Sequence, residues 1–184
     1  MMMRKAGLTL GIALTLGLGL GSAGLAAAPQ NGDPAPAFTL KTLDGQTLTR
    51  DSLKGKVVVI DFWATWCGPC IKALPEIKEL RQKNAGQPLV VVSVSVDEQR
   101  APVEEFVRKN GMDWPQVWDN QGQLAGKVFQ VASLPSYVVI DAQGRIAYRQ
   151  KGWAPMSSAA LLSQAVSRAL DTVCKPSATA DKPC

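Results

Sequence analysis

Two cysteines, Cys67 and Cys70, stand two residues apart in the segment 63–70, which reads WATWCGPC. A pair at this spacing can ligate a metal, form a structural crosslink or carry electrons through a reversible disulfide. The chain contains no histidine, which excludes Cys/His nucleophilic dyads and histidine-containing zinc sites. The other two cysteines are ten residues apart near the end of the chain and make a poor second half of a zinc site. We therefore expect no metal centre.

The position of the pair favours redox exchange over a passive crosslink, because a disulfide that closes so short a loop constrains the unfolded chain very little. If the motif spans a strand-to-helix junction, Cys67 lies at the positive end of a helix, where the dipole and unpaired N–H groups favour its thiolate. Cys70 falls in the first turn, within reach of Cys67. Gly68 and Pro69 keep this turn compact. We predict Cys67 as the nucleophile and Cys70 as the resolving thiol.

The segments on either side predict that junction. Residues 57–62 form a β-branched run without alternation, the pattern of a strand buried on both faces. After Cys67, apolar residues recur at helical spacing up to Leu80, and Pro75 should kink this helix. Asp44-Gly45 is suited to a tight hairpin turn between segments 38–43 and 46–48.

The rest of the chain continues the alternation of strands and helices. The predicted elements are a strand at 89–96, a helix at 102–110, a short helix at 121–129, an antiparallel strand pair at 136–140 and 145–151, and a closing helix at 157–173. This order predicts an α/β layered sheet with mixed strand directions.

The ends of the chain predict export. Residues 1–28 have a basic start, a long uncharged run and a small-residue end, which indicates a signal peptide or a retained N-terminal anchor. Residues 29–36 form a Pro/Gly-rich lead-in that we expect to be poorly ordered, 37–173 the domain, and 174–184 a flexible tail. The formal charge of +5 is small and scattered, which argues against nucleic acid as a partner.

The segment 62–70 looks like the active-site segment of thioredoxins. The span 31–173 resembles the exported TlpA/ResA-like branch of that superfamily through its lead-in 32–38, its hairpin 43–45 and the segment 55–59. The resemblance implies a thioredoxin fold, with a mixed central sheet flanked by helices and an added N-terminal β-hairpin.

Two further positions match this family. Asp61 is a carboxylate in an apolar predicted strand, where burial should raise its pKa, and the matching acid of thioredoxins relays a proton to the second cysteine. A strand-end aspartate in water is the alternative. Pro135, after Leu134, implies by resemblance a cis peptide bond facing the disulfide, although an ordinary trans proline is the commoner case. The lysine that partners the acid in thioredoxins has no clear counterpart in 91–96, and Ala73 replaces a glutamate common in the TlpA/ResA branch.

Substrate contacts are predicted around the cysteines. The residues are Trp66, Gly68, Pro69, Leu134 and Pro135. We expect Trp63 and Trp66 to belong to the core, with Trp66 also shielding Cys67 and offering a flat contact surface. Trp114 and Trp118 are interpreted as packing residues without a chemical role.

Cys174 and Cys184 leave two alternatives open. In an oxidising compartment they are expected to form a structural disulfide that closes the tail. The other hypothesis is a shuttle pair that exchanges with the motif cysteines.

These observations predict an exported, periplasmic or otherwise extracytoplasmic thiol:disulfide oxidoreductase that needs no cofactor. The Gly-Pro pair between the cysteines resembles that of strongly reducing thioredoxin, near −270 mV, so we expect a reductase of protein disulfides. Its partners would be exported proteins with thiols or disulfides and a membrane thiol reductant, and the family implies apocytochrome c or copper-site cysteines as substrates. A metal chaperone, a vestigial binding module and a thiol peroxidase are the alternatives, although Ile60 and Ala64 stand where the peroxidase signature needs proline and threonine.

Overall fold

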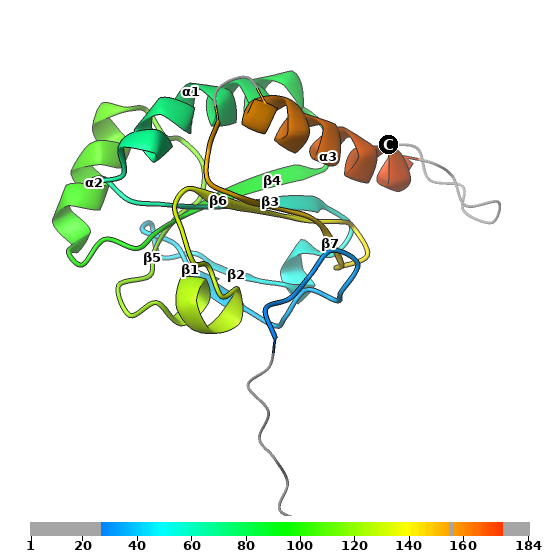
Figure 1. Ribbon diagram of the computed structural model, residues 1–184, viewed down its shortest axis with the longest axis horizontal. Coiled ribbons are helices and arrows are strands. Elements are labelled where there is room, and N and C mark those ends of the chain that lie inside the picture. Colours follow the sequence, from blue (N-terminus) through cyan, green and yellow to red (C-terminus); the bar gives the residue numbers. More distant parts are fainter. Residues whose placement is uncertain (1–26, 155–156, 175–184) are drawn as a thin grey trace, which may run out of the picture.

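The centre of the molecule is a five-stranded mixed sheet in the order β5-β4-β3-β6-β7 (Figure 1). The computed structural model describes residues 27–154 and 157–174. Strands β4 and β5 run parallel to β3, β6 pairs antiparallel with β3, and β7 pairs antiparallel with β6. The strands are β3 (Val57–Trp63), β4 (Leu89–Ser95), β5 (Gln116–Trp118), β6 (Ser136–Ile140) and β7 (Ile146–Lys151).

Helices cover one face of this sheet and the N-terminal hairpin covers the other (Figure 1). The helices are α1 (Gly68–Lys83), α2 (Arg100–Lys109) and α3 (Ser157–Cys174). The hairpin consists of β1 (Thr39–Lys41) and β2 (Thr47–Thr49), and its turn contains Gly45 at a positive φ of 88°. The thioredoxin fold with an added hairpin is thus confirmed.

Strand β3 lies between the two layers, and all seven of its residues are buried. Alternate side chains point to opposite faces of a strand. Val57, Val59 and Trp63 join the core beneath the helices, while Val58 and Ile60 join the core beneath the hairpin. A strand covered on both faces needs apolar residues at every position, which explains the uninterrupted β-branched run of the sequence.

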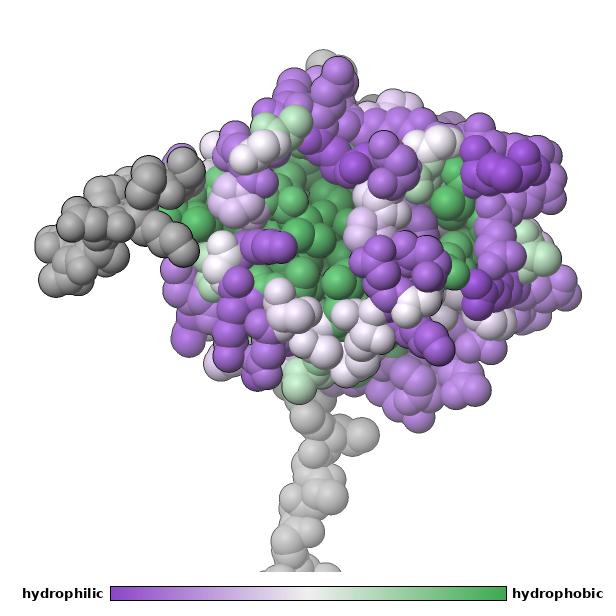
Figure 2. Space-filling view, turned by 180° about the vertical axis from the view of Figure 1, so that it is seen from behind, coloured by the Kyte–Doolittle hydropathy of each residue, from purple (hydrophilic) through white to green (hydrophobic). Residues whose placement is uncertain are grey.

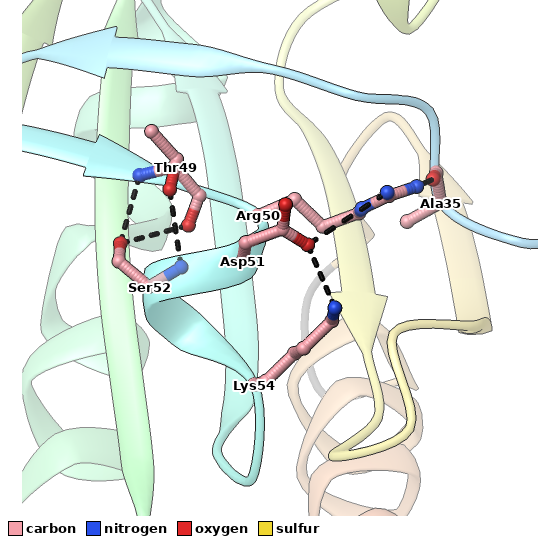
Figure 3. Close-up of polar contacts among 6 residues, drawn as sticks. All are labelled: Ala35, Thr49, Arg50, Asp51, Ser52 and Lys54. Carbon is pink, nitrogen blue, oxygen red and sulfur yellow. Dashed lines mark hydrogen bonds and ion pairs between the residues drawn. The ribbon is translucent and has the colours of Figure 1, made fainter.

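The hairpin is fixed to the rest of the chain just after β2, where a single 3₁₀ turn, η1 (Asp51–Leu53), follows (Figure 3). The backbone N–H of Thr49 donates to Ser52 Oγ at 2.9 Å, and the N–H of Ser52 donates to Thr49 Oγ1 at 3.0 Å. Beside this turn, Arg50 Nη1 donates to the carbonyl oxygen of Ala35 at 2.8 Å. Leu53 is buried and closes the core under the hairpin.

The lead-in is hydrogen-bonded to the domain, although the sequence predicted a poorly ordered segment. The N–H of Gly32 donates to the carbonyl of Ile146 at 2.8 Å, and that of Ala35 donates to the carbonyl of Gly144 at 2.9 Å. Ala35 is also buried in the core beneath the hairpin. Residues 32–35 therefore lie along the edge of the sheet at β7, because an edge strand offers unpaired backbone groups that a neighbouring segment can satisfy.

Two elements differ from the prediction near residue 120. Strand β5 was not predicted, because it is only three residues long and its only strand partner in the sheet, among the described residues, is β4, with a single further bridge from Val117 to Thr42. The predicted helix 121–129 is a shorter π-helical segment, η2 (Gln123–Val128). Its first N–H groups donate to the buried carboxylate of Asp119, which accepts from Gln123 at 2.9 Å and from Ala125 at 2.8 Å.

On the face seen from behind, hydrophilic residues surround a group of apolar residues in the middle (Figure 2). Within the described ranges, no helix combines the length and the apolar character needed to cross a bilayer. The predicted leader lies almost wholly outside the described residues.

Phe129 should be a large contributor to stability, because it is fully buried and its ring packs against Phe38 and Phe62 at centroid distances of 5.9 and 5.5 Å. We expect Phe129→Ala to lower the free energy of unfolding by about 3 to 5 kcal/mol, measured by urea denaturation. Leu161→Ala is the matched control, since Leu161 is 50% exposed on α3, and it should cost less than about 0.5 kcal/mol. Equal losses in the two variants would contradict the assignment of this core.

Candidate active site

The two cysteines of the motif are joined in a disulfide at the start of α1. Cys67 is the N-cap residue of the helix, and its sulfur accepts a hydrogen bond from the backbone N–H of Cys70 at 3.3 Å. The predicted strand-to-helix junction is thus confirmed. When the disulfide is reduced, the same N–H group and the helix dipole stabilise a thiolate on Cys67.

The two tryptophans before Cys67 have different environments. Trp63 is buried, and its ring packs against Phe106 at a centroid distance of 5.1 Å. Trp66 is 69% exposed, so the prediction that it belongs to the core is wrong. It follows the end of β3, where neither layer covers it, and it presents a flat apolar surface to solvent beside the disulfide.

A groove of about 600 Å³ lies beside the disulfide. Its lining includes Cys67 and four of the five predicted contact residues. The rest of its apolar wall comes from η2, from the segment before β6 and from Val96. The lining residues include Trp66, Gly68, Pro69, Leu134, Val96 and Ala125. The groove thus offers an apolar surface next to Cys67.

The fifth predicted contact residue, Pro135, is buried at the start of β6. The peptide bond between Leu134 and Pro135 is cis, as the family resemblance implied. The carbonyl oxygen of Pro135 accepts a hydrogen bond from the N–H of Gly152 at 2.7 Å. Pro135 therefore shapes the backbone beneath the groove, while Leu134 reaches its lining.

Asp61 lies on the helix-facing side of β3, in phase with Val59 and Trp63, whose cluster includes both cysteines. It is only 6% exposed. Burial raises the pKa of this carboxyl from 3.8 to about 7, and a hydrogen bond from Ser93 opposes the rise. The predicted buried acid with a raised pKa is confirmed, and the alternative of a solvated strand-end aspartate is excluded.

The position opposite Asp61 on β4 holds Ser93. Ser93 Oγ donates to Asp61 Oδ2 at 2.9 Å and accepts from the indole N–H of Trp114 at 2.8 Å. The expectation that Trp114 only packs is therefore wrong, because its N–H belongs to the hydrogen-bond chain of the buried acid.

Tyr137 faces Asp61 from the other side, on β6. Burial strongly raises the pKa of this phenol, and the charges of Asp61 and Glu76 raise it further. The phenol thus stays neutral while Asp61 titrates.

Asp97 is a site residue that the sequence analysis missed. Its buried carboxylate accepts hydrogen bonds from the N–H of Thr65 at 3.0 Å and from Thr65 Oγ1 at 2.6 Å. Ser95 Oγ donates to the same carboxylate at 2.7 Å. Asp97 thereby ties the loop before Cys67 to the end of β4. An acid just after a buried parallel strand was the available signal, because parallel strands end at a common edge of the sheet.

Trp118 also does more than pack, since its indole N–H donates to the carbonyl oxygen of Asp97 at 2.8 Å. Cys184 and the side chain of Cys174 lie outside the described residues. Both hypotheses for that pair therefore stay predictions.

Asp61 should make the stability of the oxidised protein depend on pH. Its pKa is 3.8 in the unfolded chain and about 7 in the native state, so the native protein keeps a proton that the unfolded chain has lost between these values. The resulting stabilisation is complete below the unfolded pKa and disappears as the pH rises through about 7. Asp61→Asn should become progressively more stable than the wild type over this window, by on the order of a few kcal/mol.

Urea unfolding of the wild type and of Asp61→Asn, both with the disulfide intact, at about pH 4, 6 and 8 measures this difference. Asp171→Asn, an exposed change on α3, is the matched control and should not reproduce it. A difference that stays constant across the window would contradict the burial of a titrating Asp61.

Comparison with known proteins places this arrangement in a family. The model of the family described as Redoxin matches residues 30–162. The thiol-disulfide oxidoreductase ResA of Bacillus thuringiensis subsp. konkukian is 32% identical over 121 residues, which span 66% of this chain and 69% of that protein. ResA of Bacillus subtilis is 32% identical over 115 residues, spanning 62% of this chain and 64% of that protein.

The fold is matched by solved structures as well. A chain from Chlorobium tepidum described as a thiol:disulfide interchange protein DsbE superimposes with a TM-score of 0.72 at 28% identity, over 78% of this chain and 99% of that one. The chain therefore belongs to the redoxin family and is a TlpA/ResA-like thiol-disulfide oxidoreductase of the thioredoxin superfamily.

Proposed function

We propose that this oxidoreductase acts outside the cytoplasm as a reductase of disulfides in exported proteins. The observation that carries the proposal is the Cys67–Cys70 disulfide at the helix N-terminus, beside an apolar groove of about 600 Å³ and on the same layer as the buried Asp61. A groove of this kind suits a polypeptide segment, since its walls are apolar and the reactive sulfur lies within it.

The reaction starts from the reduced pair. The Cys67 thiolate attacks one sulfur of a substrate disulfide, the substrate S–S bond breaks, and the leaving thiolate takes up a proton. Asp61 then accepts the thiol proton of Cys70, whose sulfur attacks Sγ of Cys67 and releases the second substrate thiolate. Two electrons have moved to the substrate, and the motif ends as the Cys67–Cys70 disulfide that the structure contains.

The dipeptide between the cysteines supports the reducing direction, because Gly-Pro is the pair of strongly reducing thioredoxin. A Cβ atom added at Gly68 would meet no atom within 4 Å. The glycine therefore relieves no internal clash, and as a lining residue of the groove it leaves room beside Cys67.

Export is proposed from the N-terminal segment. Residues 1–28 serve as a signal peptide or anchor, 37–173 form the catalytic domain, and 174–184 form a tail. In a periplasmic compartment the oxidised pair is recharged by a thiol reductant in the membrane. Its substrates are exported proteins with thiols or disulfides, such as apocytochrome c or copper-site proteins.

The activity is tested by reduction of insulin with dithiothreitol as the electron source. We expect the wild type to accelerate the reaction and Cys67→Ser to reduce the rate to the uncatalysed level, because the nucleophile is lost. Leu161→Ala should retain the wild-type rate, since Leu161 lies on the outer surface of α3. A wild-type protein that does not accelerate the reaction would contradict the proposal.

The direction is tested by equilibrating the protein with a series of thiol–disulfide redox buffers. A potential near −270 mV is expected, whereas a value near −120 mV would reverse the assignment from reductase to oxidase. Trapping with Cys70→Ser in the periplasm complements this measurement, because the mixed disulfide on Cys67 cannot be resolved and identifies the partner.

A further inference from the structure

We propose that Ser93 and Trp114 form a positioning pair that fixes the hydrogen bond at Asp61 Oδ2 and so directs the exchangeable proton of this acid to its other oxygen, Oδ1. The proposal rests on the role of Asp61 as proton acceptor in the proposed function. It assigns the positioning of the proton on Asp61 to two residues outside the Cys-Gly-Pro-Cys motif.

Two hydrogen bonds connect the three side chains in a continuous chain. Asp61 and Ser93 are register partners on the parallel strands β3 and β4. Ser93 has no exposed surface, and its hydroxyl joins Asp61 Oδ2 at 2.9 Å to the Trp114 indole nitrogen at 2.8 Å. Trp114 comes from the segment before β5, so three consecutive parts of the sheet contribute one group each.

The donors and acceptors permit one arrangement of protons along the hydrogen-bond chain from Trp114 through Ser93 to Asp61. An indole N–H can only donate, so the Ser93 oxygen must accept from Trp114. Among the described residues, the structure records one acceptor for the hydroxyl proton of Ser93, and it is Asp61 Oδ2. That oxygen therefore accepts in both protonation states. A proton that enters or leaves Asp61 does so at Oδ1.

Trp114 is held so that its N–H cannot turn away. Its ring is buried, and the guanidinium of Arg81 lies over it at 4.6 Å from the ring centroid. Arg81 is itself paired with Asp113 at 2.5 Å. The indole is thus held between the core and a cation that stacks on its outer face.

The surroundings of Asp61 leave few other groups to tune it. Tyr137 faces it from β6, Ser93 faces it from β4, and Cys70 of α1 belongs to the same core layer. Glu76 of α1 acts on Tyr137, whose pKa its charge raises. Helices α2 and α3 contribute apolar residues such as Val103, Leu162 and Val166 to this layer. Of these groups, Ser93 is the one with a recorded hydrogen bond to Asp61.

The chemical consequence concerns the resolving step. The S–H bond of Cys70 breaks, its proton moves to Asp61 Oδ1, and the sulfur forms its bond to Sγ of Cys67 as the substrate thiolate departs. Ser93 stabilises the ionised acid by donating to it, and the Trp114 N–H polarises the Ser93 hydroxyl and strengthens that donation. Loss of either hydrogen bond should raise the pKa of Asp61 and shift the pH dependence of the resolving step upward.

The test is a titration of Asp61 in the oxidised protein, in which the disulfide cysteines do not titrate. The protonated carboxyl is followed by infrared spectroscopy and assigned by its loss in Asp61→Asn. Ser93→Ala should raise the pKa of Asp61 by about one unit, since a hydrogen bond to a charged group is lost. Trp114→Phe should raise it by a smaller amount, and Ser93→Thr, which keeps the hydroxyl, should restore the wild-type value.

The matched controls remove the same chemical groups from the neighbouring network. Ser95→Ala deletes a buried serine hydroxyl on the same strand that bonds to Asp97, and Trp118→Phe deletes an indole N–H that bonds to the Asp97 carbonyl. Both should leave the pKa of Asp61 within about 0.3 unit of the wild-type value, because neither group bonds to Asp61 or Ser93.

The kinetic counterpart is the pH profile of mixed-disulfide resolution, measured by stopped flow after Cys67 has reacted with a chromogenic disulfide. The midpoint should shift with the titrated pKa of Asp61 in each variant. An unchanged pKa of Asp61 in Ser93→Ala would overturn the proposal, and an unchanged pKa in Trp114→Phe would remove Trp114 from it. The titration needs no activity, so it stands or fails separately from insulin reduction by the wild type.

Discussion

Strand β3 is covered on both faces, and this double burial controls both the packing of the molecule and the chemistry of its site. Six of its seven residues are apolar and divide between the two cores, while the seventh is Asp61. A carboxyl group in such a place must be neutral or hydrogen-bonded. Among the described residues, Ser93 on β4 supplies a hydrogen bond to it, but burial has the larger effect and raises its pKa to about 7. The sheet thereby holds a carboxyl group that titrates near neutral pH, as the proposed proton transfer requires.

Strand β4 supplies hydrogen bonds to two buried carboxylates. Two serines interrupt its apolar run, and each directs a hydroxyl to a different carboxylate. Ser93 bonds to the buried acid Asp61, whereas Ser95 bonds to Asp97, which holds Thr65 in the loop before the disulfide. Because β3 and β4 are parallel and end at the same edge, one strand can bond to the buried acid and also to the carboxylate that holds the loop before Cys67. The same element thus supports both Asp61 and the segment that leads into the disulfide.

Much of the site was visible in the sequence because its signals are local. The motif spacing, the helix that it opens and the adjacent buried strand all lie within some 30 consecutive residues, so pattern and periodicity identify them. The partners of Asp61 and Thr65 lie 32 residues further along the chain, and single-sequence patterns carry no information about strand register. Strand β5 escaped prediction for a related reason, since a three-residue edge strand depends on its neighbour. The lead-in was misjudged because its proline and glycine content hides the backbone pairing with the edge at β7.

The sequence by itself determined the redox pair, the order of the elements and the presence of an acid before the cysteines, since each follows from residue type and short-range spacing. Tertiary structure alone decided which face each residue meets. It placed Trp66 in solvent and Trp63 in the core, and it gave Asp61 a hydrogen bond from Ser93, which in turn accepts one from the indole of Trp114. The physical reason is that burial and hydrogen-bond partnership arise when distant strands come into register, and both set the proton affinity of a buried acid.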